Sequence, residues 1–277
     1  MIHAPTPRSL GLLASALLVL CASAPAAAQQ GGARLLGRPA ATVAAYDAAV
    51  RREDAPPPFR SAADSLAWER TRVAAHGAAG RRLVVSVRER RLWWMDGSDT
   101  LFAAPVGVGK GTKLEYGSKA WEFTTPRGVR RVRAKERNPV WTPPEWHYVE
   151  LARDSAWTLV HLHRGAGVRL PDGSRVVVRG ERIVHVRADG GVEEIPADEE
   201  VIFGDTLFVP PHGTANRRIP GELGAYKLEL GDGYMLHGTP YKDSIGRAAT
   251  HGCIRLADAD IEHLYRNVPV GTPVHIY

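Results

Sequence analysis

Short runs of β-branched, aromatic and leucine residues, separated by glycine, proline and aspartate, occupy most of the chain after residue 80. Runs of about four to eight such residues between turn signals are typical of β-strands. The first runs are residues 83–87 and 91–94, and a clear alternating run covers residues 226–230. We therefore expect residues 81–277 to form a mainly β domain that closes with a strand at residues 271–276.

Residues 1–28 have the composition of a secretory signal peptide. Arg8 precedes an apolar run at residues 10–20, and small residues at 24–28 provide a cleavage point. That run is shorter than the ~20 residues needed to span a bilayer. We therefore predict an exported protein with no stable membrane span after cleavage. A lipid anchor on Cys21 is the alternative, although Leu20 stands where such an anchor requires a small residue.

Residues 29–80 are rich in alanine, arginine and proline. Residues 40–52 and 61–75 favour helix by composition, but their apolar faces are narrow. We expect residues 29–80 to be a linker or a loosely docked helical arm. The adjacent arginines Arg81 and Arg82 are expected to be solvated.

Cys253 is the only cysteine left once the leader is removed, so an intramolecular disulfide is excluded. A thiol is strongly nucleophilic only as its thiolate, which requires a nearby base or a positive field. His237 lies far enough upstream for a loop to fold its imidazole back against the sulfur. Gly252, directly before the cysteine, leaves room for a substrate carbonyl to approach backbone N–H groups. This arrangement indicates acyl transfer on a cysteine.

Two motifs carry a resemblance to a known family. They are His237-Gly238-Thr239 and Thr250-His251-Gly252-Cys253-Ile254-Arg255. Together they resemble the catalytic signature of the L,D-transpeptidases, the YkuD-type domain. Residues 125–128 and 138–144 resemble secondary patterns of the same family. A second triplet, His212-Gly213-Thr214, lacks a preceding apolar strand, and we interpret it as a loop.

The resemblance implies a β-sandwich or barrel of the L,D-transpeptidase type with a short C-terminal helix. We place that helix from residue 257 to residue 265, with Asp258 as its N-cap. Residues 145–218 interrupt the family pattern and contain hairpin signals of their own. We expect them to form an inserted β-rich subdomain or a lid.

The resemblance also implies roles for individual residues. Cys253 would be the nucleophile and His237 its base, and Gly238 would orient the imidazole through its carbonyl oxygen. The N–H groups of Gly252 and Cys253 would bind the oxyanion.

The remaining site residues keep more than one interpretation. His251 would be a second base or, with Thr250, part of the scaffold. Arg255 would favour the thiolate or grip a substrate carboxylate, with a structural salt bridge as the alternative. Thr239 and Trp141 are predicted to contact substrate, and a packed core position is an equal interpretation for Trp141. No metal ligand and no cofactor is predicted.

The implied reaction is formation of a Cys253 thioester with a peptidoglycan tetrapeptide stem. The acyl group would then pass to an amine of a second stem or of a wall-anchored protein, in the periplasm or cell wall. With water as the acceptor, the enzyme would be an L,D-carboxypeptidase. We also expect carbapenems to acylate the cysteine.

Two functions of other classes remain as alternatives. One is a non-catalytic wall-binding module, and the other is a hydrolase with His237, His251 and Cys253 as zinc ligands. The formal net charge of +6 suits a polyanionic neighbour such as cell wall. No recognition motif supports nucleic acid as a partner.

Overall fold

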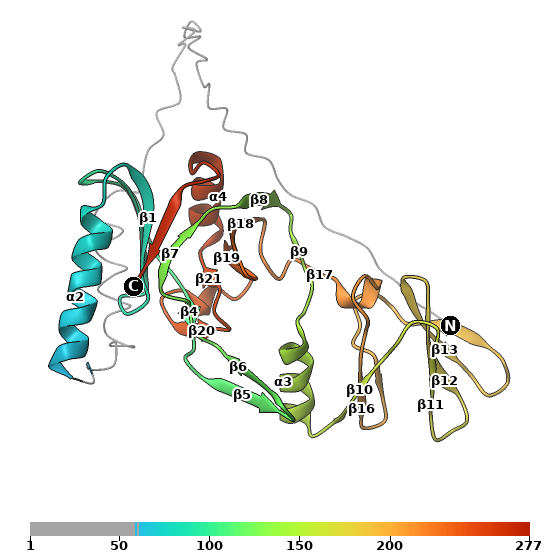
Figure 1. Ribbon diagram of the computed structural model, residues 1–277. Coiled ribbons are helices and arrows are strands. Elements are labelled where there is room, and N and C mark those ends of the chain that lie inside the picture. Colours follow the sequence, from blue (N-terminus) through green and yellow to red (C-terminus); the bar gives the residue numbers. More distant parts are fainter. Residues whose placement is uncertain (1–58, 60) are drawn as a thin grey trace, which may run out of the picture. The chain divides into compact units, whose positions relative to one another are not determined.

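The computed structural model describes Phe59 and residues 61–277. The predicted signal peptide, Cys21 and the helix expected at residues 40–52 lie outside the described residues. Strands predominate over helices in residues 61–277 (Figure 1), so the prediction of a mainly β fold is confirmed. No helix in this part of the chain is long and apolar enough to cross a membrane.

Two mixed sheets enclose the principal core. The first has the strand order β3-β2-β1-β22-β7, and the second has the order β21-β19-β18-β8. The strands of the first sheet are β1 (Arg81–Ser86), β2 (Arg91–Asp96), β3 (Asp99–Pro105), β7 (Gly128–Arg131) and β22 (Pro273–Ile276). Those of the second are β8 (Ala134–Arg137), β18 (Tyr226–Gly231), β19 (Tyr234–His237) and β21 (Ile254–Arg255). The parallel pairs are β1 with β22 and β19 with β21, and the other pairs are antiparallel.

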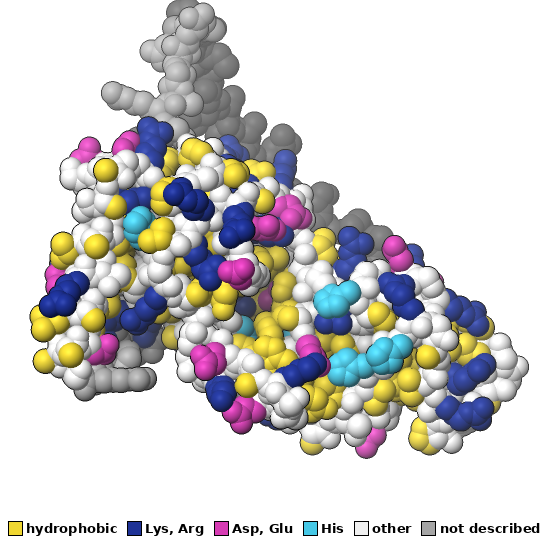
Figure 2. All heavy atoms as spheres, in the orientation of Figure 1, with side chains coloured by type: hydrophobic (Ala, Val, Ile, Leu, Met, Phe, Trp, Pro, Cys, Tyr) yellow, Lys and Arg dark blue, Asp and Glu magenta, His cyan; other side chains and the backbone are white. Residues whose placement is uncertain are grey.

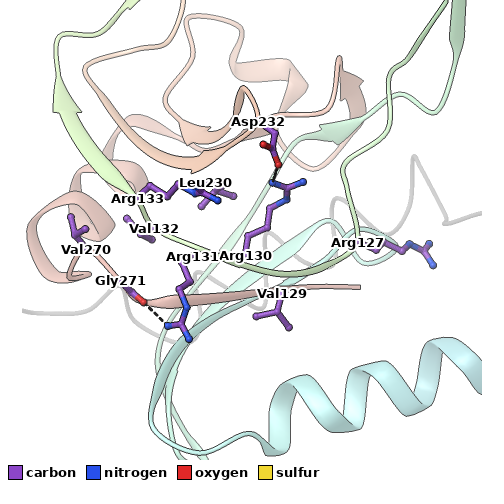
Figure 3. A pocket seen from close by; sticks show the side chains of 10 residues that line it. All are labelled: Arg127, Val129, Arg130, Arg131, Val132, Arg133, Leu230, Asp232, Val270 and Gly271. Atoms are coloured by element: carbon purple, nitrogen blue, oxygen red, sulfur yellow. Dashed lines mark hydrogen bonds and ion pairs between the residues drawn. The ribbon is translucent and has the colours of Figure 1, made fainter.

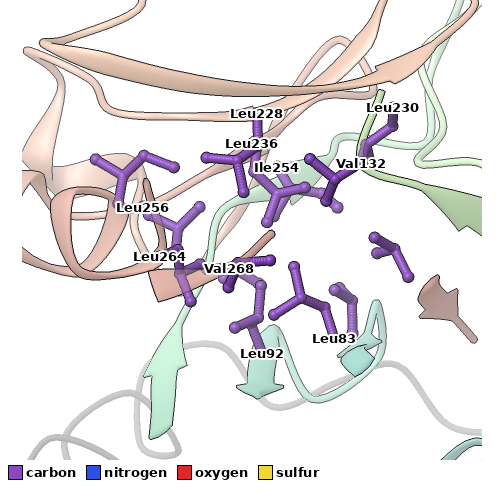
Figure 4. Packing of buried hydrophobic residues seen from close by; sticks show 14 of the residues in the cluster. Leu83, Leu92, Val132, Leu228, Leu230, Leu236, Ile254, Leu256, Leu264 and Val268 are labelled. Carbon is purple, nitrogen blue, oxygen red and sulfur yellow. The ribbon is translucent and has the colours of Figure 1, made fainter. Parts of the chain in front are cut away.

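Alternate residues of these strands fill the space between the two sheets (Figure 4). Leu83 and Val85 of β1 meet Leu228 and Leu230 of β18 in this layer, and each of the four is at most 1% exposed. Side chains two apart on a strand project from the same face, which explains the spacing. Burial of an aliphatic side chain of this size contributes about 1.5–3 kcal/mol. The layer therefore holds the two sheets together.

Helix α4 (Asp258–Asn267) covers the same core with the buried side chains of Ile261 and Leu264. The helix was predicted, but the N-cap assigned to Asp258 is wrong, because Ala257 occupies that position. Asp258 instead lies in the first turn, where a negative charge favours the positive end of the helix dipole.

Six short strands form three further pairs around the two sheets. They are β4 (Val108–Gly109) with β20 (Ala248–Thr250), β5 (Lys113–Tyr116) with β6 (Lys119–Glu122), and β9 (Val140–Trp141) with β17 (Ile219–Pro220). Two short 3-10 helices, η1 (Ala215–Arg217) and η2 (Lys242–Ser244), lie between strands. Strand β20 leads directly into the turn that carries Cys253.

Residues 145–218 begin with helix α3 (Glu145–Ser155) and continue as two small sheets of order β10-β16-β15 and β11-β12-β13-β14. Their strands are β10 (Thr158–His161), β11 (Gly167–Arg169), β12 (Arg175–Arg179), β13 (Arg182–Val186), β14 (Val192–Glu194), β15 (Ile202–Phe203) and β16 (Thr206–Val209). The two sheets share a hydrophobic core of their own, which includes Val176, Ile183 and Phe208. The segment is thus β-rich after an initial helix that the sequence analysis did not predict.

Helix α3 is packed on two sides. Tyr148 and Ala152 contact residues of β16, whereas Val149 packs against Leu114 and Phe123 next to the β5-β6 hairpin. The helix therefore joins that hairpin to the sheet β10-β16-β15.

Helix α2 (Ala62–Gly77) packs on the face of the first sheet that points away from the principal core. Val84, which alternates with Leu83 and Val85, contacts Ala75 on this face. Arg82 shares the face and is 0% exposed, so the expectation that it is solvated is wrong. Its guanidinium donates to the carbonyl oxygens of Ala75, His76, Gly80 and Gly97.

Replacing Arg82 with methionine should lower the free energy of unfolding by about 3 kcal/mol, because the buried carbonyl groups of the α2 C-terminus lose charged donors. Urea denaturation followed by tryptophan fluorescence would measure this loss. Arg81→Met is the matched control, since Arg81 is exposed and its side chain pairs with Asp96 at 3.0 Å. A surface pair contributes about 0–1 kcal/mol. Equal losses in the two variants would show that Arg82 does not anchor α2.

Candidate active site

Strands β19 and β21 bring His237 and Cys253 to the same side of the second sheet. The two strands are parallel, with Leu236 opposite Ile254 and His237 opposite Arg255. Leu236 and Ile254 face the principal core and are at most 1% exposed. Because side chains alternate along a strand, His237, Cys253 and Arg255 project from the opposite side.

The side chains of His237 and Cys253 line one cavity of about 1170 Å³. The predicted site residues in its lining are Trp141, His237, Thr250, His251, Cys253 and Arg255. The lining does not include Gly238, Thr239 or Gly252. Within residues 145–218 it includes only Trp146 and His147 of α3. The described structure therefore gives no support to a lid formed by the sheet β11-β12-β13-β14.

His237 is held in one orientation by the backbone of its neighbour. Its Nδ1 lies 2.5 Å from the carbonyl oxygen of Gly238, which can only accept a hydrogen bond. The proton of the neutral ring therefore resides on Nδ1, and Nε2 is left as an acceptor. Burial lowers the pKa of His237 to about 4, the Gly238 hydrogen bond opposes this shift, and the charge of Arg255 adds to it. The imidazole is thus neutral at neutral pH and able to accept a proton.

Cys253 is half-buried, and its thiol donates to the carbonyl oxygen of Gly233 at 3.8 Å. Burial raises the pKa of the Cys253 thiol, while a hydrogen bond from the Met235 backbone and the charge of Arg255 oppose the rise. The thiol and the imidazole of His237 are therefore both neutral in the resting site. Two neutral groups suit proton transfer to the imidazole during attack rather than a permanent thiolate, and among the described residues the resting thiol is hydrogen-bonded to Gly233 and not to His237.

The turn before Cys253 is fixed by the hydroxyl group of Thr250. This hydroxyl donates to the carbonyl oxygen of Cys253 at 2.7 Å and accepts the N–H of Gly252 at 3.1 Å. The Gly252 N–H is therefore engaged within the turn, which differs from its expected role as an oxyanion donor. The N–H of Cys253 remains as the expected donor. Thr250 itself is 1% exposed and acts as scaffold.

His251 contacts several side chains that the sequence analysis did not select. Its Nε2 lies 2.6 Å from Glu150 Oε2 and 3.1 Å from Lys110 Nζ. The ring stacks on Trp146 at 4.0 Å between centroids and meets the edge of Phe123 at 4.5 Å. Burial lowers the pKa of His251, and the hydrogen bond to Glu150 opposes this. These contacts favour the scaffold interpretation over a second base.

Arg255 lines the same cavity as His237 and Cys253. Its guanidinium lies 3.9 Å from Glu222 and 5.3 Å from the ring centroid of Tyr241. Its Nε is buried and has no hydrogen-bond partner within residues 61–277. The distant salt bridge and the unpartnered donor fit both interpretations of Arg255, a structural ion pair and a contact for a substrate carboxylate.

Thr239 and Trp141 differ in their positions. The Thr239 hydroxyl accepts the N–H of Tyr241 at 3.1 Å, and the residue is 2% exposed. The predicted substrate contact of Thr239 thus has no support in the cavity lining. Trp141 lines the cavity, and its ring also packs 5.0 Å from the ring of His147.

A second hollow, of about 720 Å³, lies beside β7 and contains four arginines (Figure 3). These are Arg127, Arg130, Arg131 and Arg133. Their guanidinium groups diverge. Arg130 pairs with Asp232 at 2.9 Å, and Arg131 donates to the carbonyl oxygen of Gly271 at 3.0 Å. Arg127 points away from both in Figure 3. The hollow contains no nucleophile and no converging set of donors.

Charged side chains are interspersed over the face shown in Figure 2, and the basic ones do not gather into a single patch there. Within the described part of the chain, no three His, Cys, Asp or Glu side chains are placed to hold a metal ion. The zinc alternative therefore finds no ligand group in His237, His251 and Cys253.

Comparisons with known proteins identify L,D-transpeptidases as the similar proteins. A family model described as the L,D-transpeptidase catalytic domain, YkuD, matches residues 80–276. The probable L,D-transpeptidase YbiS of Escherichia coli is 27% identical over 196 residues, which cover 69% of this chain and 43% of that protein. The probable L,D-transpeptidase ErfK/SrfK of Escherichia coli is 30% identical over 196 residues, with 70% and 43% covered. The chain thus matches less than half the length of these relatives.

The solved structures that resemble this chain include an L,D-transpeptidase from Xylanimonas cellulosilytica. The two share 14% sequence identity and a TM-score of 0.38, over 72% of this chain and 61% of that one.

Proposed function

The chain belongs to the YkuD family of L,D-transpeptidase catalytic domains, and from this membership we propose that it is a cysteine acyltransferase acting on peptidoglycan stem peptides. The observation that supports the proposal is the shared face of β19 and β21. His237 and Cys253 project from it into one cavity, and the tautomer of His237 leaves Nε2 as an acceptor. Export by the signal peptide and a location in the periplasm or cell wall are parts of the same proposal.

In the first half of the reaction, Sγ of Cys253 attacks the carbonyl carbon that precedes the terminal D-alanine of a tetrapeptide stem. The thiol proton passes to Nε2 of His237 as the C–S bond forms. The N–H of Cys253 stabilises the oxyanion. When the C–N bond breaks, the amine of D-alanine takes the proton from Nε2 and leaves. A thioester on Cys253 remains.

In the second half, a side-chain amine of another stem attacks the thioester carbon. Nε2 of His237 accepts a proton from this amine and returns it to Sγ as the C–S bond breaks. The product is an L,D cross-link, or an attached protein if the amine belongs to a wall-anchored protein. Water in place of the amine would give the carboxypeptidase reaction.

Incubation with purified tetrapeptide-stem muropeptides tests the proposal. We expect released D-alanine and a cross-linked dimer of the calculated mass, identified by mass spectrometry. Shortened monomer without dimer would assign the carboxypeptidase reaction instead. Muropeptide that binds the protein but stays chemically unchanged would support the wall-binding module and contradict the enzyme.

A further inference from the structure

We propose that Glu150 and Lys110 are positioning residues for Cys253, acting through His251, so that helix α3 fixes the catalytic turn. The proposal rests on the proposed function for its meaning in catalysis, but the contacts themselves do not depend on it. His251 stands two residues before Cys253 and directly before Gly252. Any shift of its ring therefore moves the turn that carries the nucleophile.

The geometry assigns the proton on His251. A carboxylate oxygen has no proton to donate at neutral pH, so the 2.6 Å contact between Glu150 Oε2 and Nε2 requires an N–H on Nε2. Lys110 Nζ, 3.1 Å from the same Nε2, then makes no hydrogen bond to His251, because both atoms carry only donors. Lys110 Nζ then donates to the other carboxylate oxygen, Glu150 Oε1, at 2.7 Å. Glu150 thus links the imidazole of His251 to the ammonium group of Lys110 by two charge-assisted hydrogen bonds. Such bonds are stronger than those between neutral groups.

The contact is partly shielded from water, and the two α3 side chains that meet His251 lie on one face of the helix. The side chains of Glu150, Lys110 and His251 are 17%, 27% and 25% exposed. Trp146, four residues before Glu150, lies on the same face of α3 and stacks on the His251 ring with an interplanar angle of 16°. One turn of α3 therefore sets both the plane of the ring and the direction of its N–H.

The same helix contains a matched contact that does not reach the catalytic turn. Glu145 accepts from Lys119 Nζ at 2.5 Å and lies 3.1 Å from His161 Nε2. The residue types and the helix are the same as in the Glu150 group. Glu145 and Glu150 are both absent from the cavity lining, but Glu145 contacts His161 whereas Glu150 contacts His251. Glu145 is therefore a control for loss of a carboxylate from α3 without loss of the contact to His251.

The test measures the rate at which iodoacetamide alkylates Cys253, followed by intact mass. Glu150→Gln and Lys110→Met should each slow alkylation about tenfold, because a displacement of about 1 Å at a reacting group can cost as much as 100-fold in rate. Glu145→Gln should stay within about twofold of the wild type, the scatter expected of an independent site. The conservative Lys110→Arg should stay near the wild-type rate for a different reason, because arginine keeps a charged donor to Glu150. Rates within about twofold for Glu150→Gln would overturn the proposal.

A double-mutant cycle distinguishes positioning from a general loss of structure. If Glu150 acts through His251, Glu150→Gln should change the alkylation rate by less than about twofold in a His251→Gln background. Glu145→Gln should have the same small effect in both backgrounds. Multiplicative losses from Glu150→Gln and His251→Gln would contradict the proposal.

A parallel arm with a carbapenem separates this inference from the proposed function. If the wild type is alkylated in a Glu150-dependent manner but gains no carbapenem mass, the proposed function fails and the positioning role stands. If acylation occurs at equal rates in wild type and Glu150→Gln, the positioning role fails and the enzyme remains.

Discussion

Replacing His237 with glutamine is expected to slow acylation of Cys253 by a carbapenem about 10²- to 10⁴-fold, the range of a positioned general base. The reason is the resting protonation state. Burial raises the pKa of the Cys253 thiol, so little thiolate exists at neutral pH, and in the proposed reaction the attacking sulfur gives its proton to Nε2 of His237. The rate is measured as the gain of one carbapenem mass by the intact protein over time.

The direction in which the acylation rate changes with pH can also be checked. The pKa of His237 is lowered to about 4, so the wild-type rate should be level above this pH and fall as the pH drops through it, where imidazolium no longer accepts a proton. The His237→Gln variant should lack this acid limb. Its rate should rise with pH as the thiolate forms, because no base assists it.

Two controls accompany the measurement. Cys253→Ala should gain no mass at all. His212→Gln removes the histidine of the other His-Gly-Thr triplet, which forms a turn outside the cavity, and should react as the wild type does. A His237→Gln protein that is acylated at the wild-type rate would contradict the role proposed for His237.

Replacing Gly252 with alanine is expected to lower the acylation rate about 100-fold, because the added methyl group displaces the catalytic turn. Gly252 has a φ of +124°. A Cβ atom there would lie 2.9 Å from the backbone oxygen of Thr124 and 2.9 Å from the ring of Tyr234. The first of these is backbone and cannot move aside easily. The loss is measured with the same carbapenem mass assay.

Gly190→Ala separates backbone strain from this close contact. Gly190 also has a positive φ, of +88°, but a Cβ atom added there would meet no other atom of the described residues within 4 Å. We expect Gly190→Ala to cost about 1–2 kcal/mol of stability through strain alone and to keep the acylation rate. If Gly252→Ala also keeps the wild-type acylation rate, the turn before Cys253 accommodates the added methyl group, and the predicted displacement of this turn is contradicted.

The strands, and His237 and Cys253 as candidate site residues, could be predicted from the sequence because each depends on a local pattern. Alternating runs place Leu228 and Leu230 in the core, and the His-Gly-Cys context marks Cys253. Strand pairing then decides whether His237 and Cys253 share a face, and the register of β19 with β21 supplies that answer. No local pattern contains this register.

Other features could not be predicted because they depend on partners distant in sequence. Arg81 and Arg82 are adjacent and of one residue type, yet strand alternation exposes one and buries the other beneath α2. Glu150 and Trp146 show the four-residue spacing of a helix face, which would have indicated a shared target had α3 been recognised. The competition of the Thr250 hydroxyl for the Gly252 N–H depends on side-chain rotation that a sequence does not specify.

Strand β22 lies between β1 and β7 and pairs in parallel with β1, where Leu83 is opposite Val274. Most of the described chain lies between β1 and β22 in the sequence. Pairing these two strands therefore closes a long loop and costs backbone entropy. Chains dominated by such non-local pairings fold slowly. The first sheet should therefore assemble late, after the local hairpin of β1 and β2, and its unpaired edges are the surfaces that a chaperone would need to protect until then.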